Sequence, residues 1–505
     1  MRIALVNGPL RSAVCDFGVG HQMPLGLLMI GGPVLAAGHE VKLIDAAREH
    51  LSDAEIARRV AAFGADVVMI AHVGSTSAHP CCLRVLRSVK AALPACITVY
   101  GGVHPTYHFR EILAGHPEVD VIVRGEGEAT TLDLVSALAA NGSHAEAPHV
   151  GDLSGVRGIA WRSGGEIVTN ASRPPIADLD AWPIGWDLIG DWDQYRAFGL
   201  GRAAVVQFSR GCPHTCTYCG QWMFWRRWRH RDVVRFVDEL ERLHREHDVC
   251  FFWLADENPT TLKDVWKGVL AEIAQRHLPV GLCASIRAQD IVRDADILHL
   301  YKQAGFLYVL MGVETVTDDT LSRIRKGSRV DDAYQAVRLL RQHNIMSIVD
   351  YIFGLEDETP RTIWRGLRGL LRYDGDFVNA LFITPHSWTP LGHQMRDETI
   401  VEPDIRKWDY RHQVVGVKHL SPGQLFIGVK LVELLYHLHP RRLWRILTVP
   451  DRALRHQLRF AFLHTSVVFV YELFERAMGS LRRRAAAPVA EEHAASATEA
   501  VEISA

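Results

Sequence analysis

The stretch FSRGCPHTCTYC, residues 208–219, contains three of the chain's nine cysteines. Cys212, Cys216 and Cys219 form a C-x3-C-x2-C pattern, and the proline, histidine and threonine between the first two are not typical of a packed core. A structural zinc site needs four ligands, and no second cysteine pair follows nearby in the sequence to complete one. Thiolates are the usual ligands of iron–sulfur clusters, and three thiolates on a four-iron cluster leave one iron open. The pattern therefore predicts a cluster with a vacant coordination position, where a substrate or cosubstrate can bind.

The cysteine stretch overlaps the end of the first of six predicted strands. These strands are apolar runs at 203–209, 249–256, 280–285, 306–315, 345–355 and 378–385, and helical segments separate them. Six strand–helix units favour a partial (β/α)6 barrel over residues 201–401. Such barrels carry their chemistry on the loops that follow the strands, which is where the cysteines lie.

The first 145 residues show a second alternating series. Apolar runs at 2–7, 40–45, 66–72, 97–102 and 120–128 indicate buried parallel strands, and the segments 53–63 and 82–93 have helical spacing. Five such units predict a doubly wound sheet that binds its ligand at the carboxyl ends of the strands. Glycine, hydroxyl and histidine residues collect at those ends, in the segments 74–77, 101–106 and 125–128.

The other segments complete the expected domain organisation. Residues 146–200 are predicted to be a linker with a hairpin at GIAWRSGGEIVTN (158–170), and residues 402–483 are predicted to be a helical C-terminal region. Between 421 and 484 there are eleven Lys or Arg against four Asp or Glu. We expect these cationic helices to cap the barrel; peripheral contact with the inner membrane is the alternative. The segment 484–505 lacks large apolar side chains and predicts a disordered tail.

The composition of the 505 residues excludes several classes of protein. A formal net charge of -2 argues against nucleic acid as a partner, because phosphate binding normally requires a basic excess. No stretch reaches the roughly 18 apolar residues expected of a membrane span. The N-terminus runs directly into a strand without a long apolar targeting segment, so we expect a cytoplasmic protein with reduced thiols.

The cysteine pattern after the first strand of a partial barrel resembles that of the radical S-adenosylmethionine (SAM) superfamily. The segments LADENP (254–259), SIR (285–287), GVET (312–315), DYIFGLEDET (350–359) and TPHSWTPLG (384–392) resemble further motifs of that superfamily, in the same order. The resemblance implies that the three cysteines hold a [4Fe-4S] cluster whose open iron binds SAM and whose electron cleaves it to a 5'-deoxyadenosyl radical. It also implies SAM contacts from Tyr218, Asp256, Glu257, Ser285, Arg287 and Glu314.

A doubly wound domain before such a barrel resembles the cobalamin-binding class of radical SAM enzymes. The segments GSTSAHP (74–80), GGVHPT (101–106) and RGEGE (124–128) carry the similarity, since glycine lets the backbone approach a corrinoid closely. The D-x-H-x-x-G motif, whose histidine binds cobalt in other cobalamin domains, is absent. A scaffold that has lost its ligand, or that binds another nucleotide, is the alternative. The implied cobalamin-binding residues are Gly74, Ser75, Thr76, Ser77, Gly101, Gly102, Val103, His104, Pro105, Thr106, Gly125 and Glu126.

Longer segments resemble one family within this class, the anaerobic magnesium-protoporphyrin IX monomethyl ester oxidative cyclases. They are VVQFSRGCPHTCTYCGQ (205–221), FWRRWRHRD (224–232), IVRDADILHLYKQAG (291–305) and KWDYRHQV (407–414). The resemblance implies oxidation of the 13-propionate methyl ester side chain, with water as the oxygen source, and closure of the fifth ring of bacteriochlorophyll. It also implies a low-potential electron donor.

The substrate contacts and the catalytic groups are less clear from the sequence. Trp225, Arg229, His386 and Trp388 are candidates for contact with a flat, carboxylate-bearing pigment, because they offer aromatic faces and a cation. No residue is assigned as a catalytic acid or base. Two other functions stay open: a cobalamin-dependent radical SAM methyltransferase acting on a tetrapyrrole or another apolar substrate, and a non-catalytic corrinoid or tetrapyrrole sensor.

Overall fold

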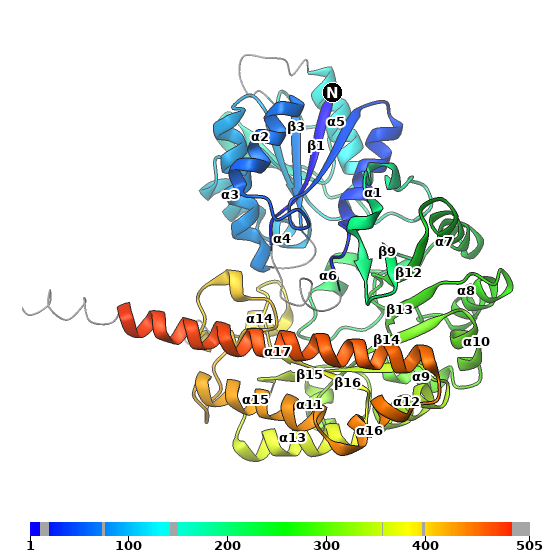
Figure 1. The fold of residues 1–505 in the computed structure, drawn as a ribbon. Coiled ribbons are helices and arrows are strands. Elements are labelled where there is room, and N and C mark those ends of the chain that lie inside the picture. The colour runs from blue at the N-terminus through cyan, green and yellow to red at the C-terminus, as the bar shows by residue number, and fades with distance from the viewer. Residues whose placement is uncertain (11–19, 73–75, 142–149, 356, 396–398, 487–505) are drawn as a thin grey trace, which may run out of the picture.

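The computed structural model describes residues 1–10, 20–72, 76–141, 150–355, 357–395 and 399–486. Figure 1 shows an N-terminal α/β domain stacked on a second, larger α/β domain, with the C-terminal helices across one side of the latter. Gly74 and Ser75, which we predicted to bind cobalamin, and residues 487–505 of the predicted tail lie outside the described residues. No helix within the described ranges combines the length and the apolarity needed to cross a bilayer.

The N-terminal domain is the predicted doubly wound sheet. Its parallel strands follow the order β2-β1-β3-β4-β5, so the chain reverses direction across the sheet between β1 and β3, where such folds bind ligands. Helices α2, α3 and α4 supply the core on one face, and α1 and α5 supply the core on the other. The elements are β1 (Arg2–Asn7), α1 (Leu25–Ala36), β2 (Glu40–Asp45), α2 (Asp53–Phe63), β3 (Val67–Ala71), α3 (His79–Ala92), β4 (Ile97–Gly101), α4 (Val103–Gly115), β5 (Val121–Val123) and α5 (Glu128–Ala140).

The predicted hairpin belongs to this first domain rather than to a linker. Strands β6 (Ile159–Ser163) and β7 (Glu166–Thr169) pair antiparallel to each other, and β6 pairs antiparallel to β5. Gly164 and Gly165 both have positive φ, as a tight hairpin turn requires. The hairpin covers the edge of β5, which would otherwise leave its hydrogen-bonding groups unpaired. Residues 170–195 then lead into the second domain.

The second domain is the expected partial barrel. Six parallel strands stand in the order β16-β15-β14-β13-β12-β9, and the short antiparallel strand β8 (Arg196–Ala197) extends the edge beyond β9. The buried side chains between this sheet and its outer helices form the largest core of the molecule. The strands are β9 (Gly201–Val206), β12 (Val249–Leu254), β13 (Gly281–Ser285), β14 (Phe306–Glu314), β15 (Met346–Phe353) and β16 (Phe377–Phe382). The outer helices are α7 (Val233–His247), α8 (Lys263–Gln275), α9 (Ala288–Arg293), α10 (Leu298–Gln303), α11 (Asp318–Arg323), α12 (Val330–Gln342) and α13 (Pro360–Tyr373).

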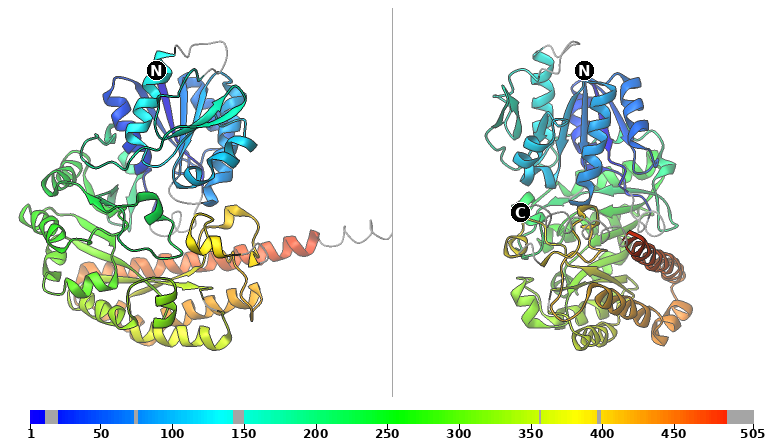
Figure 2. Two further views of the ribbon diagram at one scale, coloured as in Figure 1. Left: turned by 180° about the vertical axis from the view of Figure 1, so that it is seen from behind. Right: turned by 90° about the vertical axis from the view of Figure 1, so that its left-hand side faces the viewer.

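The C-terminal region becomes helical later than predicted. Residues 402–421 are mainly irregular, and α15 (Pro422–His437) begins at a capping box in which Ser421 and Gln424 satisfy each other's backbone amides. It is followed by α16 (Pro440–Thr448) and α17 (Arg452–Ala486). The last helix extends past residue 484, where we predicted the tail to begin. Leu454 and Leu458 of α17 pack against inward-facing barrel side chains, so this helix caps the barrel, as expected (Figure 2).

Candidate functional site

The three cysteines lie on a loop held by a short β-ribbon. Strand β10 (Ser209–Arg210) pairs with β11 (Arg229–His230), and the loop between them carries Cys212, Cys216 and Cys219. Gly211 has a φ of 91°, and a Cβ there would come within 2.5 Å of the Arg227 carbonyl oxygen, so the loop needs a glycine where it leaves the ribbon.

The surroundings of these thiols fit an iron–sulfur cluster. Burial raises the pKa of Cys212, and raises that of Cys219 to about 11, so both would be thiols without a metal. The backbone amides of Gln221 and Trp222 point at the Cys219 sulfur, and amide donors favour the thiolate form. Three cysteine sulfurs with amide donors form the kind of donor set that such clusters use.

A cavity of about 250 Å³ lies beside the cysteines and brings together residues from distant parts of the chain. Tyr218 and Cys219, from the cluster loop, line it together with Glu314 at the end of β14. His386 and Trp388, from the loop after β16, line its other side. These five residues were predicted from separate motifs to contact the cluster, SAM or the substrate, and the structure places them around one space.

Lys326 contacts two of the residues that line this cavity and was not predicted. Its ammonium group forms an ion pair with Glu314 and donates a hydrogen bond to the Tyr218 hydroxyl, 3.3 Å away. Both members of the ion pair are nearly buried, and Glu314 has the left-handed φ of 65°. A lysine twelve residues after a glutamate has no recognisable spacing, so only the folded chain reveals the pair.

The other predicted SAM contacts differ in their exposure and in their hydrogen-bond partners. Ser285 is exposed at the end of β13. Arg287 is buried, and its Nε has no hydrogen-bond partner among the described residues. Glu257 accepts a hydrogen bond from the Gly211 amide at 3.3 Å, and burial with the nearby Asp256 raises its pKa to about 8.

Asp256 holds the segment that leads into the cysteines. Its buried carboxylate accepts hydrogen bonds from the Phe208 amide, and from both the amide and the hydroxyl of Ser209. These donors belong to the segment just before the cysteines. The Asp256 side chain therefore fixes the cluster loop to the end of β12, and its contact with SAM stays a prediction.

The ends of β4 and β5 form a backbone ledge that faces the second domain. Gly102 has a φ of 111°, and Gly125 has a φ of 80° with no atom within 4 Å of the place where a Cβ would stand. The Thr106 hydroxyl donates to the Gly102 carbonyl at 2.7 Å and accepts from the Gly125 amide at 3.0 Å, which ties the two ends together. This open glycine ledge fits the close approach of a corrinoid.

A group of neutral histidines lies next to this ledge. His104 stacks between His79 and His108, with ring centroids 4.4 and 4.5 Å away. Burial lowers the pKa of His104 to about 2 and that of His79 to about 4, so both rings are uncharged at neutral pH. The Nδ1 atom of His104 is buried, and no described residue hydrogen bonds to it. Thr76, Ser77, Val103 and Pro105, which were also predicted to contact cobalamin, are buried.

His386 and Trp388 lie where the first domain meets the cavity. The His386 Nδ1 is 2.9 Å from the Thr76 hydroxyl, and its Nε2 is 2.6 Å from the Tyr410 hydroxyl. Trp388 stacks on His386 and on Tyr107, with ring centroids 4.7 and 5.2 Å away. His386 and Trp388, two of the four predicted substrate contacts, thus connect the cavity to the cobalamin-binding-like domain. Tyr410, which hydrogen bonds to His386, was not predicted.

Two other predicted contacts instead hold the domains together. Glu126, predicted to bind cobalamin, pairs with Arg210 and with the predicted substrate contact Arg229. Arg229 also donates to the carbonyl oxygens of Ile176 and Trp225, at 2.6 and 3.0 Å. All three charged groups are nearly buried. The geometry therefore places Glu126 and Arg229 in the domain interface, and their contacts with cobalamin and the substrate stay predictions.

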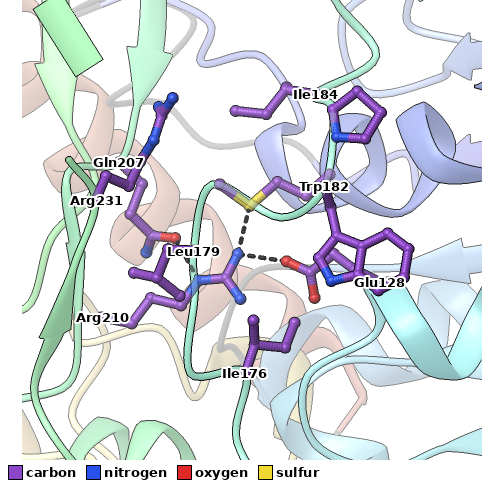
Figure 3. Close-up of a pocket in the computed structure, with 10 residues that line it drawn as sticks. Glu128, Ile176, Leu179, Trp182, Ile184, Gln207, Arg210 and Arg231 are labelled. Atoms are coloured by element: carbon purple, nitrogen blue, oxygen red, sulfur yellow. Dashed lines mark hydrogen bonds and ion pairs between the residues drawn. The ribbon is translucent and has the colours of Figure 1, made fainter. Parts of the chain in front are cut away.

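Figure 3 shows how Arg210 reaches across this interface. Its guanidinium bonds to Glu128 of the first domain and to Gln207 beside it, and lies 5.1 Å from the Trp225 ring. The cavity that it enters is only about 20 Å³, close to the size of one water molecule, so it is too small for a substrate. Opposite charges in the segments SRGC and RGEGE were the only sequence signal for this contact.

Comparison with known proteins agrees with this architecture. The radical SAM superfamily matches residues 206–368, and the B12 binding domain matches residues 18–135. A Synechocystis protein named anaerobic magnesium-protoporphyrin IX monomethyl ester cyclase is 44% identical over 482 residues, which is 95% of both chains. A protein of the same name from Cereibacter sphaeroides is 34% identical over 85% of this chain and 69% of its own length.

A solved structure shows the same fold. The radical SAM methyltransferase TsrM from Kitasatospora setae, with cobalamin and a [4Fe-4S] cluster bound, superposes with a TM-score of 0.65. The match covers 87% of this chain and 89% of the other, at 15% sequence identity, and at that identity it shows the fold alone. From its sequence similarity over nearly the whole length and its two matched domains, this chain belongs to the family of anaerobic magnesium-protoporphyrin IX monomethyl ester cyclases.

Proposed function

We propose that this protein catalyses the anaerobic oxidative cyclisation of magnesium-protoporphyrin IX monomethyl ester to protochlorophyllide, in bacteriochlorophyll biosynthesis. The observation that carries the proposal is the 44% identity to the Synechocystis cyclase over 95% of both chains. The cavity supports it, because it joins a cluster cysteine to aromatic side chains at the domain interface. A low-potential electron donor would supply the reducing electron for SAM cleavage.

The residues present fit the three cofactors that this function needs. Cys212, Cys216 and Cys219 would hold the [4Fe-4S] cluster, and the glycine ledge of the first domain would hold cobalamin. Arg287 and the paired Glu314 would bind the charged end of SAM, as the resemblance of their motifs implies. When bound, the cluster and SAM supply a carbon radical that removes hydrogen from the substrate side chain.

The side chains around the cavity would position the substrate and exclude water. Ile352, Phe382 and Trp388 form an apolar wall that suits the ester side chain of a pigment. His386 is held from both ring nitrogens, and burial lowers its pKa to about 4, so it would meet the substrate as a fixed neutral ring. With both nitrogens engaged, His386 is poorly placed to bind the magnesium ion.

Anaerobic incubation with the magnesium porphyrin ester, SAM and a reductant tests the function. The pigment should gain oxygen and lose hydrogen, as followed by mass spectrometry, and 5'-deoxyadenosine should accumulate. A pigment that gains one methyl group would identify a methyltransferase instead. Protein that contains the cluster but forms no 5'-deoxyadenosine would indicate a sensor.

We also propose that the C-terminal helices rest on an anionic membrane surface. Two apolar stripes face away from the barrel, each with the spacing of one helical face. On α15 and the residue that caps its end, the stripe is Ile427, Leu431, Leu434, Leu435 and Leu438; on α17 it is Leu463, Val467, Val470, Tyr471, Phe474 and Met478. Leu463 is 64% exposed and Phe474 is 62% exposed, so the rest of the protein does not cover these apolar side chains.

Charge beside the stripes favours a lipid surface as the partner. Arg441, Arg452, Arg459 and Arg476 are all exposed along α16 and α17. Apolar stripes with flanking arginines are typical of helices that lie in the interface of anionic bilayers. Both helices run along the same side of the molecule, so both stripes could contact one surface (Figures 1 and 2).

Vesicle flotation of the full-length protein tests this contact. Binding to vesicles that contain anionic phospholipid should exceed binding to neutral vesicles, and added salt should weaken it. The double variant Leu463→Ser, Phe474→Ser should lose binding. The control Val234→Ser changes an equally apolar, 49% exposed side chain on α7 and should keep it. Equal binding by both variants would contradict the proposal.

A further inference from the structure

Asp350, on β15, differs from the other acidic group of the large cavity. Two carboxyl groups are present among the described residues that line this cavity, those of Glu314 and Asp350. Glu314 is paired with Lys326, whereas Asp350 forms no ion pair within the described part of the chain. Its side chain is half-buried, so part of its surface faces the cavity. Asp350 is therefore a carboxyl group beside the cluster loop that is not neutralised by direct contact with a cation.

A chain of hydrogen bonds holds Asp350 in place. The Asn379 side-chain amide donates to the Asp350 Oδ1 atom at 3.1 Å, and the Asn379 Oδ1 atom accepts from Arg411 at 2.9 Å. Arg411 is fixed in turn by Glu472 of α17, at 2.7 Å. These hydrogen bonds engage one carboxyl oxygen of Asp350 and orient its side chain. The second oxygen makes no hydrogen bond to any residue that the structure describes, and a substrate or water could reach it.

The other titratable groups that line this space are poorly suited to accept a proton. Both nitrogens of His386 are engaged, by Thr76 and Tyr410. Burial raises the pKa values of the Tyr218 and Tyr410 hydroxyls, so neither becomes a base at neutral pH. Cys219 is expected to be a cluster ligand. By contrast, burial and the nearby Glu314 raise the pKa of Asp350 to about 7, a value that suits a base.

The proposed reaction needs a base at this place. Before water can add, the substrate carbon must lose a hydrogen atom to the radical derived from SAM. It must also lose an electron to a one-electron acceptor of the iron–sulfur or corrinoid class. A lone pair of water then forms the carbon–oxygen bond, an O–H bond of that water breaks, and the product is an alcohol plus one proton. In an apolar cavity that proton needs a nearby acceptor.

We propose that Asp350 accepts the proton of the water molecule whose oxygen enters the pigment, and that Asn379 and Arg411 position it for this step. The inference rests on the proposed function, because it requires a substrate carbon that is hydroxylated by water. It also explains part of the KWDYRHQV motif, since Arg411 and the cavity-lining Tyr410 both come from it. Asp350 would be the catalytic residue, and Asn379 and Arg411 would be positioning residues.

The experiment uses the reconstituted holoenzyme with the magnesium porphyrin ester, SAM and a reductant in water enriched in oxygen-18. The measured quantity is labelled pigment formed per 5'-deoxyadenosine. Asp350→Asn keeps the size of the side chain and a partner for Asn379 but removes the base, so this ratio should fall by about 100-fold or more. Asp350→Glu, which restores a carboxylate, should recover part of it.

Two further variants separate a catalytic role from a structural one. Asn379→Leu removes the positioning contact and should lower the ratio by about tenfold. Asp376→Asn is the matched control: this buried carboxyl group at the start of β16 pairs with Arg445 and does not line the cavity, so the ratio should stay at the wild-type value. A wild-type ratio in Asp350→Asn would overturn the proposal. So would an equal loss of pigment and 5'-deoxyadenosine, because it would assign Asp350 to SAM cleavage. Wild-type protein that cleaves SAM without oxygenating the pigment would instead refute the proposed function.

Discussion

At the scale of single residues, the cluster cysteines allow the most direct test. Cys216→Ala removes one of three thiolates, so the protein should bind less iron and sulfide and form no 5'-deoxyadenosine. Cys250→Ala is the control, because Cys250 is a partly buried thiol on β12 that bonds only to the Leu200 and Arg202 carbonyls among the described residues. Iron and sulfide analysis after anaerobic reconstitution measures the difference. Full cluster content in Cys216→Ala would contradict the ligand assignment.

The buried ion pair of Glu314 and Lys326 predicts a second residue-level effect. Lys326→Met leaves the Glu314 carboxylate buried without its cation, which should cost about 3 kcal/mol of unfolding free energy and weaken SAM binding. Adding Glu314→Gln to that variant should restore much of the stability but not the SAM affinity. Urea unfolding and equilibrium dialysis with SAM measure the two effects. If Lys326→Met were as stable as the wild type, the pair would not be buried as described.

Residue chemistry was predictable from the sequence only where a motif fixed it locally. The cysteine spacing, Tyr218 and Glu314 belong to such motifs, and the structure places them around one cavity. Asp350 and Tyr410 also line this cavity, and Lys326 pairs with Glu314, but no spacing in the sequence predicts these contacts, which only folding creates. The predicted contacts of Asp256 with SAM, of Glu126 with cobalamin and of Arg229 with the substrate stay predictions, although all three side chains have protein partners. Their partners lie on other segments, and those partners engage them structurally.

At the scale of secondary structure elements, period and composition predicted the parallel strands well. Strands that are buried on both faces are continuous apolar runs, and such short runs have few other structural interpretations. All eleven predicted runs form strands. The hairpin of β6 and β7 was predicted, but it was assigned to the linker and not to the first sheet. The sequence does not show which sheet edge a hairpin will pair with, because that depends on which strand is left unpaired in the folded domain. The segment 402–421 was wrongly included in the helical region, since its apolar residues pack as an irregular chain near the cavity.

The attachment of α17 predicts a dependence of stability on pH. His412 bonds to Asp409 and to Glu475 of α17, and although burial opposes it, these carboxylates raise the His412 pKa to about 9. Because the folded pKa exceeds the ordinary value of about 6.5, the stabilisation is complete below that pH and is lost as pH rises through 9. Glu475 is partly exposed, so the effect should be only about 1 kcal/mol.

Urea unfolding at pH 6 and pH 10 measures this effect. His412→Gln should abolish the part of the difference in unfolding free energy between pH 6 and pH 10 that is due to this site. His456→Gln, which changes an exposed histidine elsewhere on α17, should keep it. If the wild type and His412→Gln lost the same stability on going to pH 10, the carboxylates would not be stabilising a protonated His412.

The interface between the domains predicts a second element-level effect. Arg210→Met removes the cation that serves Glu126 and Glu128, and Glu128 then has no cationic partner in the described residues. An uncompensated buried carboxylate should loosen the contact and speed proteolysis of the connecting segment 170–195. Arg58→Met, which breaks an exposed ion pair with Glu55 on α2, is the matched control and should have no effect. Equal cleavage rates in both variants would argue against a role for Arg210 in domain contact.

At the scale of the whole molecule, the two domains meet too closely for the complete substrate. The cavity of about 250 Å³ is smaller than the roughly 300–1,000 Å³ of sites for drug-sized ligands, so it can hold an ester side chain but not a tetrapyrrole ring. Its side toward the first domain is closed by Trp388 stacked on Tyr107 and by His386 bonded to Thr76. Both closing contacts join the domains rather than elements of one domain. Entry of the ring should therefore require the domains to move apart at this contact.

Small-angle scattering can detect this movement. Adding magnesium-protoporphyrin monomethyl ester should increase the radius of gyration, whereas methyl propionate, which matches the side chain alone and fits the cavity, should not. Trp388→Ala removes the stacked contact with Tyr107 and should increase the radius without any ligand, because less energy is then needed to separate the domains. Trp364→Ala, a change at a 55% exposed tryptophan on α13, should leave it unchanged. An unchanged radius with the porphyrin bound would mean that only the side chain enters and that the ring stays outside the closed interface.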